Sequence, residues 1–203
     1  MTVSIQKSAL GLALKWAQRA LFASSMLALG YCGLVLLDTW VFQVRQARNL
    51  ERMLQDRGSP ALPDAMPAVG RDSLIGRIEV PRLGVSLIVV EGTGESELRR
   101  AAGHIAGTAL PGQGGNAGIA GHRDTLFRPL RNIRRGDRID VTTLAGEYRY
   151  RVVSTKVVDP DDVAVLRSGK QEILTLVTCY PFYFVGPAPG RFIVRAERVS
   201  ASL

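Results

Sequence analysis

The sequence contains 203 residues, of which 46% are hydrophobic and 22% are charged, and this composition is that of an ordinary globular domain with some additional chain. The formal net charge of +8 does not indicate a nucleic-acid partner, because aromatic residues, which supply the stacking platforms of such proteins, make up only 6%. Six arginines lie between residues 123 and 138, and we expect them to form a solvated basic face.

The first predicted element is a membrane-spanning helix over residues 20–37, which carry no charged side chain. At a helical rise of about 1.5 Å per residue, a segment of this length spans roughly 27 Å, which is close to the thickness of a bilayer core. A cleaved signal peptide is the alternative, but its apolar region would be shorter. Three basic residues precede the span and three follow it, so charge does not decide the orientation. The short segment 1–19 and the large remainder favour a cytoplasmic N-terminus and an extracytoplasmic domain, held at the cell membrane by a single pass.

Residues 38–72 are predicted to connect this span to a folded domain at 73–203. A helix is expected over 40–57, where apolar residues recur at helical spacing among charged ones. Gly58 is a stop signal for that helix. Three prolines follow it, and they are typical of a semi-rigid linker over 58–72.

The region from residue 73 onward consists of short apolar runs separated by turn residues, a pattern that predicts a mainly β domain. Two short helices are expected at 95–102 and 126–133, and Ala145-Gly146 is expected to form a hairpin turn. The predicted strands are 75–80, 85–91, 117–121, 138–143, 147–158, 173–178 and 192–199. Seven or eight strands with few helices indicate a closed or nearly closed β-barrel.

Three reactive side chains, His122, Cys179 and Arg191, are predicted at strand ends, where they can converge at one rim of a barrel. Cys179 is predicted to be an unpaired thiol, because the other cysteine, Cys32, lies within the apolar span. A thiolate is a strong nucleophile when positive charge lies nearby. His122 can then transfer protons, and Arg191 can stabilise an oxyanion. An inert, buried cysteine is the alternative.

Three segments resemble the active-site motifs of the sortase family. TLVTCYPF at 175–182 is similar to the segment that carries the sortase cysteine, NAGIAGHRDT at 116–125 to the histidine segment, and PAPGRFIV at 187–194 to the arginine segment. The resemblance covers residues 74–199, with the segments in the family's order. Its details look closest to class D sortases and to the sortases of Gram-negative bacteria.

The resemblance implies a cysteine transpeptidase of the hydrolase class, with a closed sortase-type barrel and no cofactor or metal. Such an enzyme would cleave an LPxTG-like sorting signal near the C-terminus of a substrate protein, hold the acyl fragment as a thioester at Cys179, and transfer it to an amine of a cell-wall precursor or a protein lysine. Thr178 and Ala120 are expected at the substrate site, Thr178 either through an oxyanion contact or by strand packing. The loop between 158 and 173 is expected to shape substrate choice.

Several other polar residues are expected to have no catalytic role. His104 is expected to pack in the fold or border a substrate groove, and Asp124 is not expected to orient His122. Asp159, Asp161 and Asp162 lack the spacing of an EF-hand, so a solvated loop is favoured over a calcium site.

Two other functions stay open at this point. A hydrolase that uses water as the acceptor would share every residue named above. An envelope-binding β-domain without catalytic activity would bind its partners through Arg123–Arg138. A cysteine L,D-transpeptidase is not favoured, because Val177-Thr178-Cys179 does not match the Ser-x-Gly-Cys context of those enzymes.

Overall fold

The computed structural model describes residues 2–56, 73–183 and 186–199. The chain divides into two units, Met1–Val41 and Phe42–Leu203. All of the strands belong to the second unit.

The N-terminal element is one continuous helix, α1 (Thr2–Asp56), where the sequence predicts two successive helices. From Leu12 onward, α1 is long and apolar enough to cross a membrane, with a mean hydropathy of 2.0 in its most apolar stretch, none of which is buried. In length and composition it is a candidate membrane anchor. The predicted stop at Gly58 and the linker over 58–72 lie outside the described residues.

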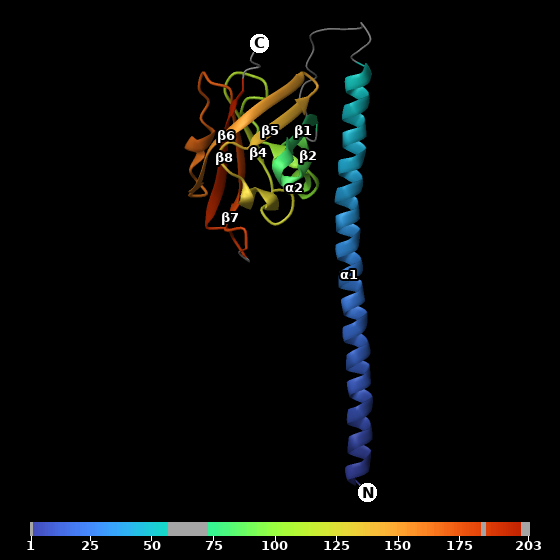
Figure 1. The fold of residues 1–203 in the computed structure, drawn as a ribbon. Helices are drawn as coiled ribbons and strands as arrows, with labels where there is room; N and C mark the ends of the chain where they lie inside the picture. Colours follow the sequence, from blue (N-terminus) through green and yellow to red (C-terminus); the bar gives the residue numbers. More distant parts are fainter. Residues whose placement is uncertain (1, 57–72, 184–185, 200–203) are drawn as a thin grey trace. The chain divides into compact units, whose positions relative to one another are not determined.

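Eight strands form a closed barrel in the order β1-β2-β3-β4-β7-β8-β6-β5 (Figure 1). Neighbouring strands are antiparallel except in the pairs β2–β3 and β4–β7. The pairing of β1 with β5 closes the barrel, and the predicted barrel is confirmed. The strands are β1 (Leu74–Val80), β2 (Val85–Glu91), β3 (Ala102–His104), β4 (Asn116–Ala120), β5 (Arg138–Thr143), β6 (Gly146–Val158), β7 (Ile173–Tyr180) and β8 (Gly190–Arg198).

The helices between the strands are short, and they differ in detail from the sequence prediction. The helix expected at 95–102 ends earlier, and its last predicted residue begins β3, a strand that was not predicted. The helix expected at 126–133 is a single stretch of 3₁₀ helix. The helices are η1 (Pro81–Leu83), α2 (Glu95–Arg100), η2 (Arg128–Asn132) and η3 (Val163–Leu166).

The hairpin between β5 and β6 is shifted by one residue from its predicted position. Thr143 pairs with Gly146, so the turn consists of Leu144 and Ala145. Gly146 has φ of 155° and starts β6 instead of completing the turn. The prediction of Ala145-Gly146 as the turn pair is therefore wrong, although the hairpin itself is present.

The barrel interior is filled by alternate side chains of the strands, because successive residues of a strand point to opposite faces. Leu174 and Leu176 of β7 and Val194 of β8 are almost completely buried there. Full burial of one such side chain stabilises the fold by about 1.5–3 kcal/mol relative to exposure. The intervening residues of β7, which include Cys179, therefore lie on the outer face of the barrel.

Candidate active site

Cys179 and Arg191 lie directly opposite each other on neighbouring antiparallel strands, β7 and β8. Residues opposite each other in such a pair project to the same face, with Cβ atoms about 4.5–5.5 Å apart. Both residues are half-buried at the outer face of the barrel. The thiol and the guanidinium belong to two different sequence motifs, and antiparallel pairing brings them together at the barrel rim.

His122 follows β4 by two residues and is held against β7 on the other side from β8. The parallel register pairs Ala120 with Val177. The N–H of Gly121 then donates to the carbonyl of Val177 over 3.1 Å, and the hydroxyl of Thr178 donates to the carbonyl of Gly121 over 2.7 Å. The backbone of His122 therefore leaves the sheet beside the strand that carries the cysteine.

Gly121 is required at this point because the chain passes close to a buried aromatic ring. A Cβ atom on Gly121 would lie 2.8 Å from the ring of Phe127, which is itself 1% exposed. The N–H of Phe127 also donates to the carbonyl of His122 over 3.0 Å and closes the turn that starts there. The position of His122 is thus set by core packing as well as by strand pairing.

Two arginines hold the segment between β7 and β8. Nη1 of Arg191 donates to the carbonyls of Gly190 at 3.1 Å and Ala188 at 3.5 Å. Arg123, the neighbour of His122, donates through Nη1 to the carbonyl of Pro181 at 3.1 Å and through Nη2 to that of Gly186 at 2.9 Å. Sequence reasoning gave Arg123 no individual role; its position next to His122 was the available signal.

The two residues predicted at the substrate site have different surroundings. Thr178 is 3% exposed, and its hydroxyl is engaged with Gly121, so it positions the histidine segment. Ala120 is half-buried on β4, next to Val177 of β7. Gly118, two residues earlier on the same face of β4, is buried, and a Cβ atom there would lie 3.0 Å from the side chain of Leu166 and 3.1 Å from that of Ile105. The face is therefore covered at Gly118, and only Ala120 is partly accessible to a bound chain.

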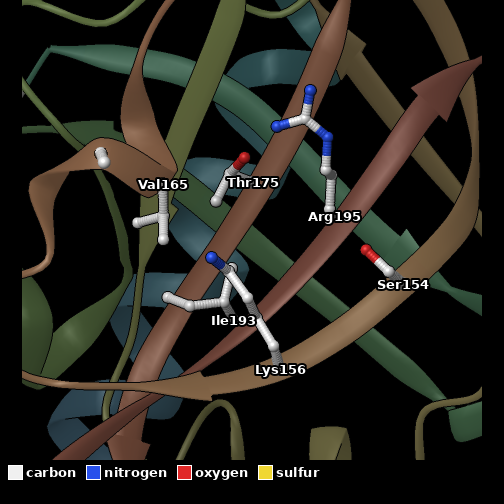
Figure 2. A pocket seen from close by; sticks show the side chains of 7 residues that line it. Ser154, Lys156, Val165, Thr175, Ile193 and Arg195 are labelled. Carbon is white, nitrogen blue, oxygen red and sulfur yellow. The ribbon is translucent and has the colours of Figure 1, made fainter.

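A pocket of about 150 Å³ lies farther along the same outer face, under η3 (Figure 2). Its floor comes from Thr175, Ile193 and Arg195. Along β7 and β8, the register pairs Thr175 with Arg195, the next outward pair is Val177 with Ile193, and the third is Cys179 with Arg191. The pocket and the cysteine therefore lie along the same outer face of β7 and β8, on which Thr175 and Ile193 are themselves almost completely buried.

The remaining polar candidates have structural contacts. His104 is 2% exposed, and its Nδ1 lies 2.6 Å from a carboxylate oxygen of Glu91. Asp162 accepts a hydrogen bond from the N–H of Ala164 over 3.1 Å and caps η3. Asp124 is exposed. Within the described ranges, no group of three or more His, Cys, Asp or Glu side chains is arranged to hold a metal ion.

Two buried titratable groups support the barrel away from the rim. Burial, with help from the carboxylate of Glu172, raises the pKa of Tyr150 well above its usual range. The hydroxyl of Tyr150 donates to Glu172 over 2.8 Å. The guanidinium of Arg82 donates to both carboxylate oxygens of Asp137, at 2.5 and 2.6 Å. These bonds lower the pKa of Asp137 below its usual range, although burial of the carboxylate acts in the opposite direction.

Comparison with known proteins gives a consistent result. The family model described as "Sortase domain" matches residues 78–199. Sortase D of Bacillus subtilis is 38% identical over 135 residues, which cover 66% of this chain and 67% of the relative. Sortase A of Listeria monocytogenes is 36% identical over 113 residues, which cover 54% of this chain but only 50% of the relative.

Solved structures show the same likeness. A Clostridium perfringens sortase D5 transpeptidase superposes with a TM-score of 0.68 at 25% identity, covering 79% of this chain and 99% of that structure. Listeria monocytogenes sortase A superposes with a TM-score of 0.58 at 30% identity, covering 64% and 89%.

Proposed function

Because this chain belongs to the sortase family of cysteine transpeptidases, we propose that it is a membrane-anchored sortase, of class D type, that cleaves an LPxTG-like sorting signal and transfers the acyl fragment to an amine. The observation that carries this proposal is the direct pairing of Cys179 with Arg191, with the segment of His122 bonded to the same strand. The class assignment draws support from the likeness to sortase D of B. subtilis; a Gram-negative affiliation has no comparable support.

In the first half of the proposed reaction, the thiolate of Cys179 attacks the carbonyl carbon of the scissile peptide bond. Arg191 donates to the oxyanion that forms, for which its planar fork of N–H groups is well suited. The tetrahedral intermediate collapses as the C–N bond breaks. Protonated His122 gives its proton to the departing amine, so a thioester at Cys179 and neutral His122 remain.

In the second half, neutral His122 accepts a proton from the incoming amine as the amine attacks the thioester. Arg191 again stabilises the oxyanion. The C–S bond breaks, the thiolate of Cys179 returns, and a new amide bond is formed. The cycle is balanced without a cofactor or metal, because each proton taken up by His122 is one that it releases in the next turnover.

We assign the anchor to residues 20–37 of α1, with the barrel outside the cytoplasm. The apolar stretch of α1 and its lack of burial support this assignment. The proposed partners are substrate proteins with an LPxTG-like signal near the C-terminus and an amine acceptor, either a cell-wall precursor or a protein lysine. A membrane location brings the enzyme to substrates that leave the cell.

The test is to incubate the full chain, in detergent, with an LPxTG-containing peptide, with and without an added amine, and to analyse protein and products by mass spectrometry. We expect a peptide adduct on Cys179 and, with the amine present, an amide product. Hydrolysis as the sole outcome at saturating amine would favour the hydrolase instead. Absence of any adduct with a panel of related pentapeptides, in a protein whose Cys179 reacts with iodoacetamide, would count against both enzymes.

A further inference from the structure

The pocket beneath η3 combines apolar side chains, two hydroxyl groups and two positive charges. Figure 2 shows Lys156 beside Ile193 and Arg195 beside Thr175, with Val165 and Ser154 on opposite sides of this group. The register confirms this arrangement, because Lys156 pairs with Ile193 across β6 and β8, and Arg195 pairs with Thr175 across β8 and β7.

Neither cation has a carboxylate partner among the residues that the structure describes. Glu197 follows Arg195 on the same face of β8 but forms no ion pair with it in the described part of the chain. The nearby acidic loop contains Asp159, Asp161 and Asp162. The carboxylate of Asp162 caps η3, and the exposed Asp159 and Asp161 form no ion pair with either cation in the described part of the chain. Lys156 is exposed and Arg195 half-buried, so both can reach a ligand.

Two cations beside a small pocket attract an anionic group more strongly than either would alone, since their potentials add. Arg195 adds the planar fork that binds a carboxylate through two parallel hydrogen bonds. The hydroxyl of Ser154, which also lines the pocket, offers a further donor. The chemistry of the pocket therefore favours a carboxylate.

The pocket is placed to contact the acyl part of a substrate. Thr175 precedes Cys179 by four residues of β7, a distance of about 13 Å at the rise of a strand. The pocket extends from β7 toward β8 and β6, whereas His122, which must reach the departing amine, follows β4 on the opposite side. The part of the substrate that stays bound through the thioester stage thus lies on the side of the pocket.

We propose that Lys156 and Arg195 form a subsite for an acidic residue that directly precedes the pentapeptide of the sorting signal. An extended peptide also rises by about 3.3 Å per residue, so the residue four positions before the threonine at the scissile bond reaches the pocket. In an LPxTG-like signal that position is the one before the leucine. This inference rests on the proposed function and adds a charge preference to it.

The test uses the full chain in detergent and three peptides that differ only in the residue before the leucine, which is Glu, Gln or Lys. The measurement is kcat/KM for transfer of each peptide to a soluble amine. We expect kcat/KM for the Glu peptide to exceed that for the Gln peptide by about 2- to 5-fold, the scale of a partly solvated ion pair, and the Lys peptide to be the poorest substrate. Because such a pair is screened, the preference is expected to shrink between low and high salt.

The variant Lys156→Gln/Arg195→Gln is expected to lose the preference, so that its kcat/KM values for the Glu and Gln peptides become equal. Arg151→Gln, which removes an exposed cation from the middle of β6, is the matched control and is expected to keep the preference. The double reversal Lys156→Glu/Arg195→Glu is expected to prefer the Lys peptide. Equal kcat/KM for the three peptides, or a preference that survives the double Gln substitution, would overturn the subsite. Failure to turn over any peptide would instead refute the proposed function, and the subsite with it.

Discussion

One of the two histidines lies in β3 and the other just after the neighbouring strand β4, and their environments differ. His104, in β3, is 2% exposed, and both ring nitrogens have partners: Glu91 at 2.6 Å on one side, and the carbonyl of Ala109 and the hydroxyl of Thr108, each at 3.0 Å, on the other. His122, after β4, is half-buried at the rim. A ring whose hydrogen-bonding capacity is used within the fold stabilises the fold, whereas a ring at the rim can exchange protons with a substrate.

The largest expected effect is at the rim. Cys179→Ala removes the atom that would form the thioester, so no acyl adduct and no transfer product are expected by mass spectrometry. The fold should be retained, because the residue lies on the outer face and alanine is compatible with a strand end. An adduct on another residue of a well-folded Cys179→Ala protein would remove Cys179 from the proposed mechanism.

His122→Ala is expected to separate chemistry from stability. Loss of the proton carrier should lower turnover by about 10²–10⁴-fold. Alkylation of Cys179 should persist, and the thermal midpoint should stay close to that of the wild type, because no core contact is lost. Turnover within a few-fold of the wild type would show that His122 carries no proton in the reaction.

Arg191→Lys keeps the positive charge but loses the planar fork. If Arg191 stabilises the oxyanion by directed hydrogen bonds, the rate of acyl transfer should fall by about 10²–10³-fold, as for one lost oxyanion donor. Near-normal rates would mean that only a positive charge is needed there. Circular dichroism is the control, since Arg191 also bonds to the carbonyls of Gly190 and Ala188.

His104→Ala is the counterpart of His122→Ala, because it is expected to lower the stability of the fold and not the rate of the reaction. Removal of the ring leaves the largely buried Glu91 without its partner, a loss on the order of 3 kcal/mol in the free energy of unfolding. Denaturant titration measures this, and kcat per folded molecule should remain within about threefold of the wild type. A stable His104→Ala protein with a strongly reduced kcat would contradict the assignment of a structural role to His104 and a catalytic role to His122.

The smallest effect is expected from Asp137→Asn, which tests how the ion pair between Arg82 and Asp137 contributes to stability at different pH values. Because Arg82 lowers the pKa of Asp137 in the folded state, the ion pair contributes stability above the unfolded aspartate pKa of 3.8 and loses that contribution as pH falls through the folded value. The thermal midpoint of Asp137→Asn should thus lie below the wild type at pH 6, and the gap should narrow below pH 3. A gap that stays constant with pH would contradict the ion-pair explanation.

Much of the fold could be predicted from local pattern. The predicted bounds of β2 and β5 agree with the structure, because their apolar runs end at turn residues. β3 was missed because three residues give no usable period, and it forms only where β2 and β4 hold it on both sides. α1 was predicted as two helices, but no proline occurs within 2–56 to interrupt it.

By itself, the sequence determined the apolar span, the barrel class and the identity of the three reactive side chains, because periodicity, charge and residue chemistry are local properties. Tertiary structure alone decided which of them become neighbours. The antiparallel register sets Cys179 opposite Arg191, and the parallel pairing of β4 with β7 joins segments 57 residues apart through Thr178 and Gly121. The contacts of Arg123 and the pairing of Lys156 and Arg195 around one pocket likewise depend on strands that meet only when the barrel closes.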